Sequence, residues 1–283
     1  MNRKQNISFS VLLATACILF FSCENKKGKN YDLKFDSIRI ERTAHLLGQD
    51  TNPACQVSIL FTHIAQSSNP LLKDSLNSLF IAQTFDGEVS GNKAREAVED
   101  YIARYIMNYR TELDSVYLED RKTNPEAETV QAWYSYTKDV RTEVQNLQGD
   151  LLTYRIYFEE YTGGAHGTYY TSFLNIDLNT LTTLSLDDLF VGDYQEPLAK
   201  LICLQLMAQN NVSTREELEN LGYGVTGDIL PIENFYLDDK GITFFYNVYD
   251  ISPYALGTSS VTIPYSHMEA LLSEHPILKQ LKK

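Results

Sequence analysis

The chain has 283 residues, and 37 acidic side chains against 24 lysines and arginines give a formal net charge of −13 at pH 7. This balance argues against a nucleic-acid-binding protein, which needs a basic surface, and against a polybasic membrane-binding patch. The length corresponds to roughly one and a half to two ordinary domains, enough for a sizeable hydrophobic core. Nineteen tyrosines favour half-buried strands, with an aromatic binding surface as the alternative.

The first 22 residues have the pattern of a secretory signal peptide. Arg3 and Lys4 give a positive start, an apolar run follows over residues 7–21, and the small Ser22 precedes Cys23. The run is shorter than the roughly 20 residues that cross a membrane. The cysteine after Ser22 resembles a bacterial lipobox, so we expect a lipoprotein anchored in the cell envelope by acyl chains on Cys23. An ordinary secretory leader is the alternative, and Cys17 is a weaker cleavage position.

Cleavage before Cys23 would leave 22 basic and 37 acidic side chains, or −15, on the mature chain. Residues 23–32 are then predicted to be a polar tether, on the periplasmic face or the cell surface. Of the remaining cysteines, Cys55 lies on the apolar side of a strand pattern and Cys203 lies in a helical pattern. An oxidising envelope would permit a disulfide between them, and two buried free thiols are equally reasonable.

Residues 33–148 are predicted to form an N-terminal α+β domain. Apolar and polar residues alternate over 35–46 and 55–64, which predicts two strands separated by a turn at 50–53. Pro70 opens a predicted helix. A longer helix is predicted over 93–118, where apolar residues recur at intervals of three and four.

Residues 149–283 are predicted to form a second, C-terminal α+β domain. Gln148-Gly149-Asp150 joins strands at 133–144 and 151–161 in a hairpin that crosses the boundary. Further elements are predicted as strands at 168–178, 181–186, 235–237, 242–248 and 261–265, and as helices near 198–206, from Thr214 and from Ser266-His267-Met268-Glu269. The overall prediction is an α+β fold in two subdomains, with a mostly antiparallel sheet and packed helices.

The most unusual internal segment is Tyr161-Thr162-Gly163-Gly164-Ala165-His166-Gly167. Three glycines in five residues allow positive φ angles and the close approach of another chain or a ligand. One interpretation is a tight strand connection in which His166 packs locally. The other is a binding surface formed by His166 with Tyr161, Tyr169 and Tyr170.

Common catalytic and metal-binding motifs are missing from the sequence. No His-Glu-x-x-His, zinc-ligand spacing, Gly-x-Ser-x-Gly or phosphate-binding loop occurs, so we predict no metal, no cofactor and no catalytic residue. Asp187-Asp188 and Asp238-Asp239 are interpreted as a helix start and a hairpin turn, because the oxygen-rich spacing of a calcium loop is absent.

Three segments together resemble a known family: 161–167, then Leu184-Ser-Leu-Asp-Asp-Leu-Phe190, then Tyr246-Asn-Val-Tyr-Asp-Ile-Ser-Pro-Tyr-Ala-Leu-Gly257. They resemble the domain of unknown function in the extracytoplasmic part of the anti-sigma factor RsiV. Residues 33–148 look like the domain that precedes it there and in the peptidoglycan deacetylase PdaC. The resemblance implies a role in the cell envelope, and in RsiV this region recognises lysozyme. A cytoplasmic sigma-binding segment and a separate metal-binding deacetylase domain are not expected here.

Three hypotheses follow. The first is a non-enzymatic envelope lipoprotein that binds a protein or glycan ligand, such as lysozyme or a peptidoglycan fragment. The second is a peptidoglycan- or glycan-acting hydrolase, although Glu159 and Glu160 should point to opposite faces of their strand. The third is a purely structural lipoprotein. The candidate ligand-binding residues are Tyr161, Gly163, Gly164, His166, Tyr169, Tyr170, Asp250 and Tyr254.

Overall fold

A computed structural model describes residues 31–124, 131–225 and 228–282. The expected signal peptide, the lipidation site Cys23 and most of the expected tether lie outside these residues. None of the helices in the described ranges combines the length and hydrophobicity needed to cross a membrane.

The described chain is an α+β protein with two β-sheets, which confirms the predicted fold class. The first sheet has the order β1-β2-β3-β4-β5-β6 and the second has the order β7-β8-β9. In chain order the helices and strands are β1 (Leu33–His45), β2 (Ala54–Ser67), α1 (Pro70–Thr84), α2 (Ala94–Thr123), α3 (Gln131–Tyr134), β3 (Tyr136–Gln148), β4 (Leu151–Tyr161), β5 (Thr168–Asp177), β6 (Thr182–Thr183), α4 (Leu186–Leu189), α5 (Gln195–Gln209), α6 (Arg215–Asn220), β7 (Phe235–Leu237), β8 (Gly241–Tyr246), β9 (Ser259–Pro264) and α7 (Pro276–Leu281).

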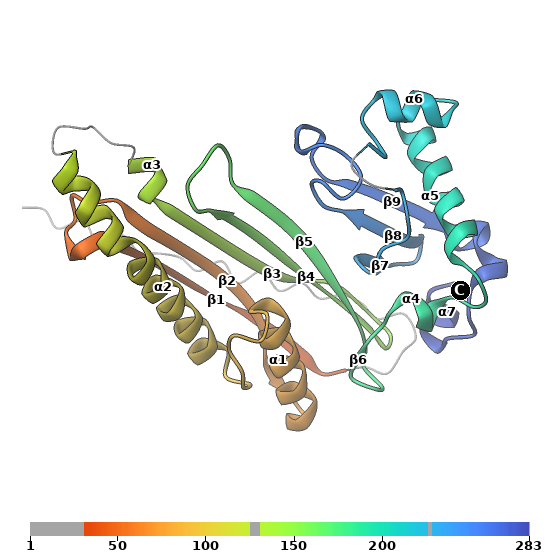
Figure 1. Ribbon diagram of the computed structural model, residues 1–283. Coiled ribbons are helices and arrows are strands. Elements are labelled where there is room, and N and C mark those ends of the chain that lie inside the picture. The colour runs from red at the N-terminus through yellow and green to blue at the C-terminus, as the bar shows by residue number, and fades with distance from the viewer. Residues whose placement is uncertain (1–30, 125–130, 226–227, 283) are drawn as a thin grey trace, which may run out of the picture.

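The first sheet is antiparallel except where β2 pairs with β3 in parallel. Parallel neighbours need a long crossover connection, and α1 and α2 lie in the segment that supplies it. α1 begins at Pro70, where the Asn69 side chain accepts a hydrogen bond from the Leu72 amide at 3.2 Å. Both helices lie on the same face of the sheet (Figure 1).

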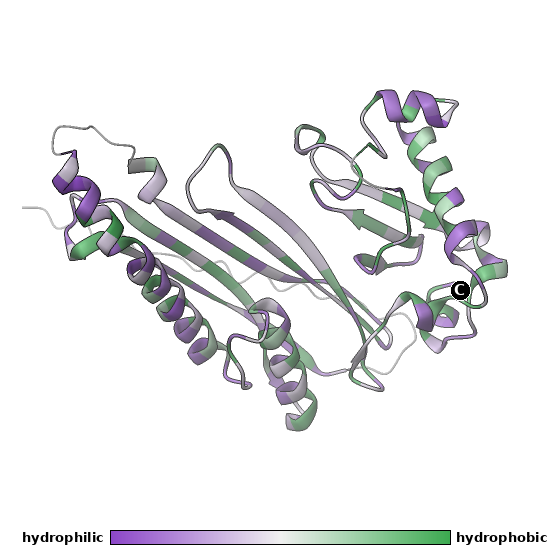
Figure 2. Cartoon of the chain, viewed as in Figure 1, coloured by the Kyte–Doolittle hydropathy of each residue, from purple (hydrophilic) through white to green (hydrophobic). Residues whose placement is uncertain are grey.

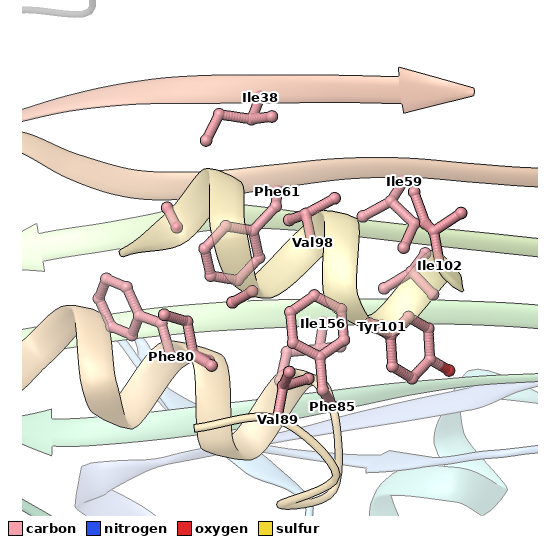
Figure 3. Close-up of a cluster of buried hydrophobic side chains, with 14 of the residues drawn as sticks. Ile38, Ile59, Phe61, Phe80, Phe85, Val89, Val98, Tyr101, Ile102 and Ile156 are labelled. Atoms are coloured by element: carbon pink, nitrogen blue, oxygen red, sulfur yellow. The ribbon is translucent and has the colours of Figure 1, made fainter. Parts of the chain in front are cut away.

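Successive strand residues point to opposite sides of the sheet, so residues at every second position share a face. The apolar residues of the strands occupy the positions that face the two helices. The strands show alternating hydrophobic and hydrophilic bands in Figure 2, and α1 and α2 contribute their hydrophobic sides to the same core. Figure 3 shows this first core, in which Phe61, Phe85 and Tyr101 form a series of stacked rings with centroids 5.6 and 4.6 Å apart. Burying side chains of this size contributes about 1.5–3 kcal/mol each.

The C-terminal body, residues 184–282, has a second core of its own. Ile202 and Leu206 on α5 are buried together with Phe235 and Phe244 of the second sheet. α6 starts with a capping box in which Thr214 and Glu217 exchange side-chain-to-backbone hydrogen bonds. The C-terminal body packs on its own apolar residues and meets the first sheet at β5.

The junction between the two bodies is built on the edge of β5. Strand β6 pairs with β5 only at Ile176 and Asp177, so the rest of this edge needs other hydrogen-bond partners. Asn234 and Asn247 supply them: the amides of Phe173 and Thr171 donate to their side-chain oxygens at 3.1 and 2.7 Å. Both asparagines also donate to the Thr171 carbonyl.

Two predicted elements differ from the structure, and a third begins later than predicted. The strand expected from Trp133 begins only at Tyr136, because Gln131–Tyr134 form the short helix α3. The strand expected over 181–186 is reduced to β6, because Ser185 and Asp188 form a capping box that starts α4. The capping-box spacing at 266–269 does not open a long helix, so this prediction was wrong. Two short 3₁₀ turns occur there, and Leu272 then pairs with Phe190 in an extended bridge, which delays the terminal helix α7 until Pro276.

The expected domain boundary at 148/149 lies in the β3–β4 turn, within the first sheet. The residues of the second core begin mainly at Leu184. Cys55 and Cys203 are free thiols, so the disulfide considered from the sequence does not form. Cys55 is buried in the first core, whereas Cys203 packs against the second, which separates the two sulfurs.

Candidate functional site

The loop between β4 and β5 has the compact geometry that its glycines suggested. Gly163 and Gly164 adopt φ angles of +88° and +97°, which side-chain-bearing residues rarely reach. A Cβ atom on Gly163 would lie 2.9 Å from the carbonyl oxygen of Trp133, so α3 approaches the loop closely. The Tyr161 hydroxyl donates to the Gly164 carbonyl at 2.9 Å and fixes the loop from its own strand.

The loop presents His166 to the C-terminal body. The imidazole ring stacks on Tyr254, with centroids 4.5 Å apart and planes inclined by 25°. Tyr169 meets the same Tyr254 ring edge-on, with centroids 5.7 Å apart, and the centroid of the tilted Tyr249 ring also lies 5.7 Å from that of Tyr254. We call His166, Tyr169, Tyr249 and Tyr254 the seam cluster, because it joins residues of the first sheet to residues of the C-terminal body.

One nitrogen of His166 is used within the loop. Its Nδ1 lies 2.9 Å from the Gly167 carbonyl oxygen. A carbonyl can only accept, so Nδ1 carries the hydrogen, and in the neutral ring Nε2 is then a hydrogen-bond acceptor. The side chain of His166 is exposed, so this acceptor is accessible to a ligand.

The partner segment, residues 247–257, is shaped by its own polar contacts. The Asp250 carboxylate accepts a hydrogen bond from the Asn247 amide at 2.7 Å and closes a short turn. Tyr249 lies in this turn with φ +71°, a conformation that costs energy for a residue with a side chain. The Tyr249 ring is nevertheless 52% exposed. Backbone strain of this kind clusters at functional sites, so Tyr249 is a candidate site residue.

The structure brings together only part of the residues chosen from the sequence. His166, Tyr169 and Tyr254 are in contact, and Gly163 and Gly164 shape the loop that positions His166. Tyr161 and Asp250 stabilise the two segments through the hydrogen bonds described above. Tyr249 was missed, although it lies between Tyr246 and Gly257, in one of the three segments that carry the family resemblance.

Tyr170 belongs to a different group on the helix-covered face of the sheet. Its ring stacks on Phe158 at 4.6 Å, and the Lys138 ammonium lies 3.6 Å from the centroid of the same Phe158 ring. The Glu160 carboxylate lies 3.3 Å from Lys138 Nζ and accepts a hydrogen bond from the Tyr105 hydroxyl at 2.7 Å. We call Lys138, Phe158, Glu160 and Tyr105 the lysine cage.

The lysine cage is an unusual environment for a charge. Lys138 is 6% exposed, and burial lowers the pKa of its ammonium, while the Glu160 carboxylate opposes this change. Burial and the hydrogen bond to Glu160 raise the pKa of Tyr105. Nearby, burial with a smaller effect of Glu160 raises the pKa of the Cys55 thiol to about 12, so this thiol is not reactive at neutral pH.

Glu159 and Glu160 lie on opposite faces of β4, as the strand period predicts. Glu160 belongs to the lysine cage, whereas Glu159 accepts a hydrogen bond from Tyr157 on the other face at 2.8 Å. Among the described residues, no group of three or more His, Cys, Asp or Glu side chains is arranged to bind a metal ion. Asp188 and Asp238 bind backbone amides in a helix start and a hairpin turn, as the sequence suggested.

Comparison with known proteins places the chain in a family. Residues 187–266 match the model of a protein family of unknown function, DUF3298. A solved structure of a DUF3298 member from Bacteroides fragilis is 50% identical, covers 89% of this chain and 98% of that one, and superimposes with a TM-score of 0.85. The chain belongs to the DUF3298 family.

Two further proteins are more distantly similar to this chain. A Pseudomonas aeruginosa DUF3298 protein shares the fold at 17% identity, with a TM-score of 0.59 over 86% of this chain and 95% of that one. The peptidoglycan-N-acetylmuramic acid deacetylase PdaC from Bacillus subtilis is 27% identical over 135 residues, which are 46% of this chain. The chain thus spans about a quarter of PdaC, or 28% of its length.

The DUF3298 match divides the seam cluster between two parts of the chain. Tyr249 and Tyr254 lie inside the matched residues 187–266, together with Asn234 and Asn247. The loop between β4 and β5, residues 162–167, lies before the matched segment, as does Tyr169. We call this loop, which contains His166, the glycine loop. A complete seam cluster therefore requires both the DUF3298 segment and the preceding β4–β5 hairpin.

Proposed function

We propose that this DUF3298 protein is a non-enzymatic lipoprotein of the cell envelope that binds a protein or glycan ligand on the seam cluster. The observation that supports it most directly is the contact between His166 and Tyr254. Two segments that are distant in sequence place the exposed His166 ring against the partly exposed Tyr254 ring at the junction of the two bodies. Rings with a polar tip are favoured in binding surfaces, because they bury apolar area and still form hydrogen bonds.

The relatives support a ligand from the bacterial envelope. PdaC is named for its action on peptidoglycan N-acetylmuramic acid, and part of this chain is similar to part of PdaC. The resemblance to the extracytoplasmic region of RsiV adds lysozyme as a candidate protein ligand. The net charge of −13 would favour the approach of a basic protein such as lysozyme by electrostatic steering.

The binding proposal is tested by calorimetric titration of the detergent-solubilised full-length chain with lysozyme and, separately, with a muropeptide. We expect Tyr254→Ala to lower the affinity for the ligand by about tenfold or more. Aromatic residues at a buried interface centre often contribute about 2 kcal/mol or more to the binding free energy. His166→Ala should have a smaller effect in the same direction. Tyr254→Phe keeps the ring and should retain most of the affinity.

Leu71→Ala is a matched control, because Leu71 is an exposed residue on α1, away from the seam cluster. It should leave binding unchanged. If neither lysozyme nor the muropeptide binds the unmodified chain, the proposed function is wrong. Binding that is insensitive to both Tyr254→Ala and His166→Ala would show that the site lies elsewhere.

The envelope anchor is proposed on sequence grounds alone. Metabolic labelling with a fatty acid should mark the unmodified chain and not Cys23→Ser, which should also leave the membrane fraction. Cys17→Ser is the control and should remain labelled. Labelling that persists in Cys23→Ser would contradict the assignment of the lipid to Cys23.

A further inference from the structure

A third aromatic segment adjoins the seam cluster. Trp133 is the only tryptophan of the chain and its side chain is 63% exposed, although indole is among the largest apolar groups a protein can bury. It lies in α3, whose backbone touches the glycine loop at Gly163. In Figure 1 this loop rises between α3 and the C-terminal body.

The distances along this surface are short. Gly163 and His166 are three residues apart, so at most about 11 Å of backbone separates them. His166 then stacks directly on Tyr254. An extended ligand that contacts Trp133 could therefore reach the seam cluster without leaving the surface. We call this combined surface, formed by residues 132–134, 161–169 and 249–257, the aromatic rim.

The aromatic rim is almost free of charge. Its three segments contain no lysine or arginine, and Asp250 is their only acid. The Asp250 carboxylate already accepts a hydrogen bond from the Asn247 backbone amide. The remaining polar groups are hydroxyls, the Trp133 indole N–H, His166 and backbone groups of the glycine loop. These groups form hydrogen bonds with neutral partners, whereas a net charge of −13 on the whole chain repels anionic polymers.

We propose that the aromatic rim binds an uncharged oligosaccharide, with Trp133 as a ring-stacking residue at one end and Tyr254 at the other. This inference rests on the proposed binding function and specifies its ligand class. Sugar rings have apolar C–H faces that stack on aromatic side chains, and hydroxyl edges that bond to groups such as Nε2 of His166. A basic protein is less well matched to the rim, because the rim offers only one carboxylate.

The unique tryptophan makes the test specific to one position. The full-length chain is titrated with a β-1,4-linked N-acetylglucosamine tetrasaccharide while tryptophan emission is recorded. We expect a saturable change in emission, because a sugar over the indole removes water from it. Calorimetry should show that Trp133→Ala and Tyr254→Ala each weaken binding by about tenfold or more, whereas Trp133→Phe changes it by less than about threefold.

Leu71→Ala again serves as the exposed apolar control and should bind as the unmodified chain does. Circular dichroism should show that Trp133→Ala is folded, since the lost side chain is mostly exposed. Tetrasaccharide affinity unchanged by Trp133→Ala would overturn the inference. Lysozyme binding that depends on Tyr254 without any response to the tetrasaccharide would overturn the inference and leave the proposed function standing. If lysozyme, the muropeptide and the tetrasaccharide all fail to bind, both proposals are rejected.

Discussion

Asn247 forms two hydrogen bonds with the backbone of Thr171. The Thr171 amide donates to Asn247 Oδ1 at 2.7 Å, and Asn247 Nδ2 donates to the Thr171 carbonyl at 3.0 Å. A side-chain amide thus occupies the place of a neighbouring strand on the edge of β5. The contact joins the first sheet to the C-terminal body and lies on the same strand as Tyr169.

We expect Asn247→Ala to lower the free energy of unfolding by about 1–3 kcal/mol, because the Thr171 amide loses its partner. Thr171 is buried, so water replaces the lost hydrogen bond poorly. Asn220→Ala, at an exposed position in α6, should change stability by less than about 0.5 kcal/mol. Urea denaturation followed by circular dichroism measures both variants. Equal stability of Asn247→Ala and the unmodified chain would contradict a stabilising role for this contact.

A second prediction concerns the two neighbouring glycines of the β4–β5 loop. Both have positive φ angles, but only Gly163 faces a close neighbour, since a Cβ would lie 2.9 Å from the Trp133 carbonyl oxygen. Gly164→Ala should therefore lower the free energy of unfolding only by the backbone strain, about 1–2 kcal/mol, whereas Gly163→Ala should lower it by more. Thermal unfolding of both variants compares the two costs. A larger loss for Gly164→Ala would show that the approach of α3 to the loop is unimportant.

The sequence predicted the local elements much better than the contacts between them. Alternation over 55–64 and the hairpin at 148–150 were sufficient to place β2, β3 and β4, because side-chain period and turn residues act locally. The glycine loop was found for the same reason. The 266–269 motif failed, since the bridge between Phe190 and Leu272 is a tertiary interaction that overrides a local helix signal.

The candidate site shows the same limit. His166 was selected because of its glycine neighbours, but its stacking on Tyr254 depends on how two bodies meet, which no local pattern encodes. Lys138 was missed altogether. The available signal was a lysine at an inward-facing position of β3, two residues before the buried Val140. A cation at such a position requires compensating partners, which the sequence alone does not identify.

The lysine cage gives a third prediction. Lys138→Met keeps the length of the side chain but leaves Glu160 without its cation, so we expect a loss of about 1–3 kcal/mol in unfolding free energy. Glu160→Gln added to Lys138→Met removes the remaining charge and should recover at least half of that loss. A double-mutant cycle from chemical denaturation measures the coupling. Additive effects of the two substitutions would mean that Lys138 and Glu160 do not stabilise one another.

The last prediction concerns alkaline pH and the buried tyrosines. Burial is the largest cause that raises the pKa of Tyr154, Tyr246 and Tyr265 above the ordinary value of 10.0. The folded chain keeps these protons where the unfolded chain loses them, so the stabilisation is complete below pH 10 and declines as the pH rises further. Above pH 10, each such tyrosine then lowers the free energy of unfolding by about 1.4 kcal/mol per pH unit.

Absorbance of tyrosinate, followed as the pH is raised, tests this expectation. The buried rings of Tyr154, Tyr246 and Tyr265 should ionise only together with unfolding seen by circular dichroism. Tyr246→Phe removes one of the contributing groups, although it also removes a hydrogen bond of 2.7 Å to the Leu230 carbonyl. Its stability should therefore fall less steeply above pH 10 while starting from a lower value. Ionisation of all the tyrosines near pH 10 in the folded chain would contradict the burial of Tyr154 and Tyr246 that this packing requires.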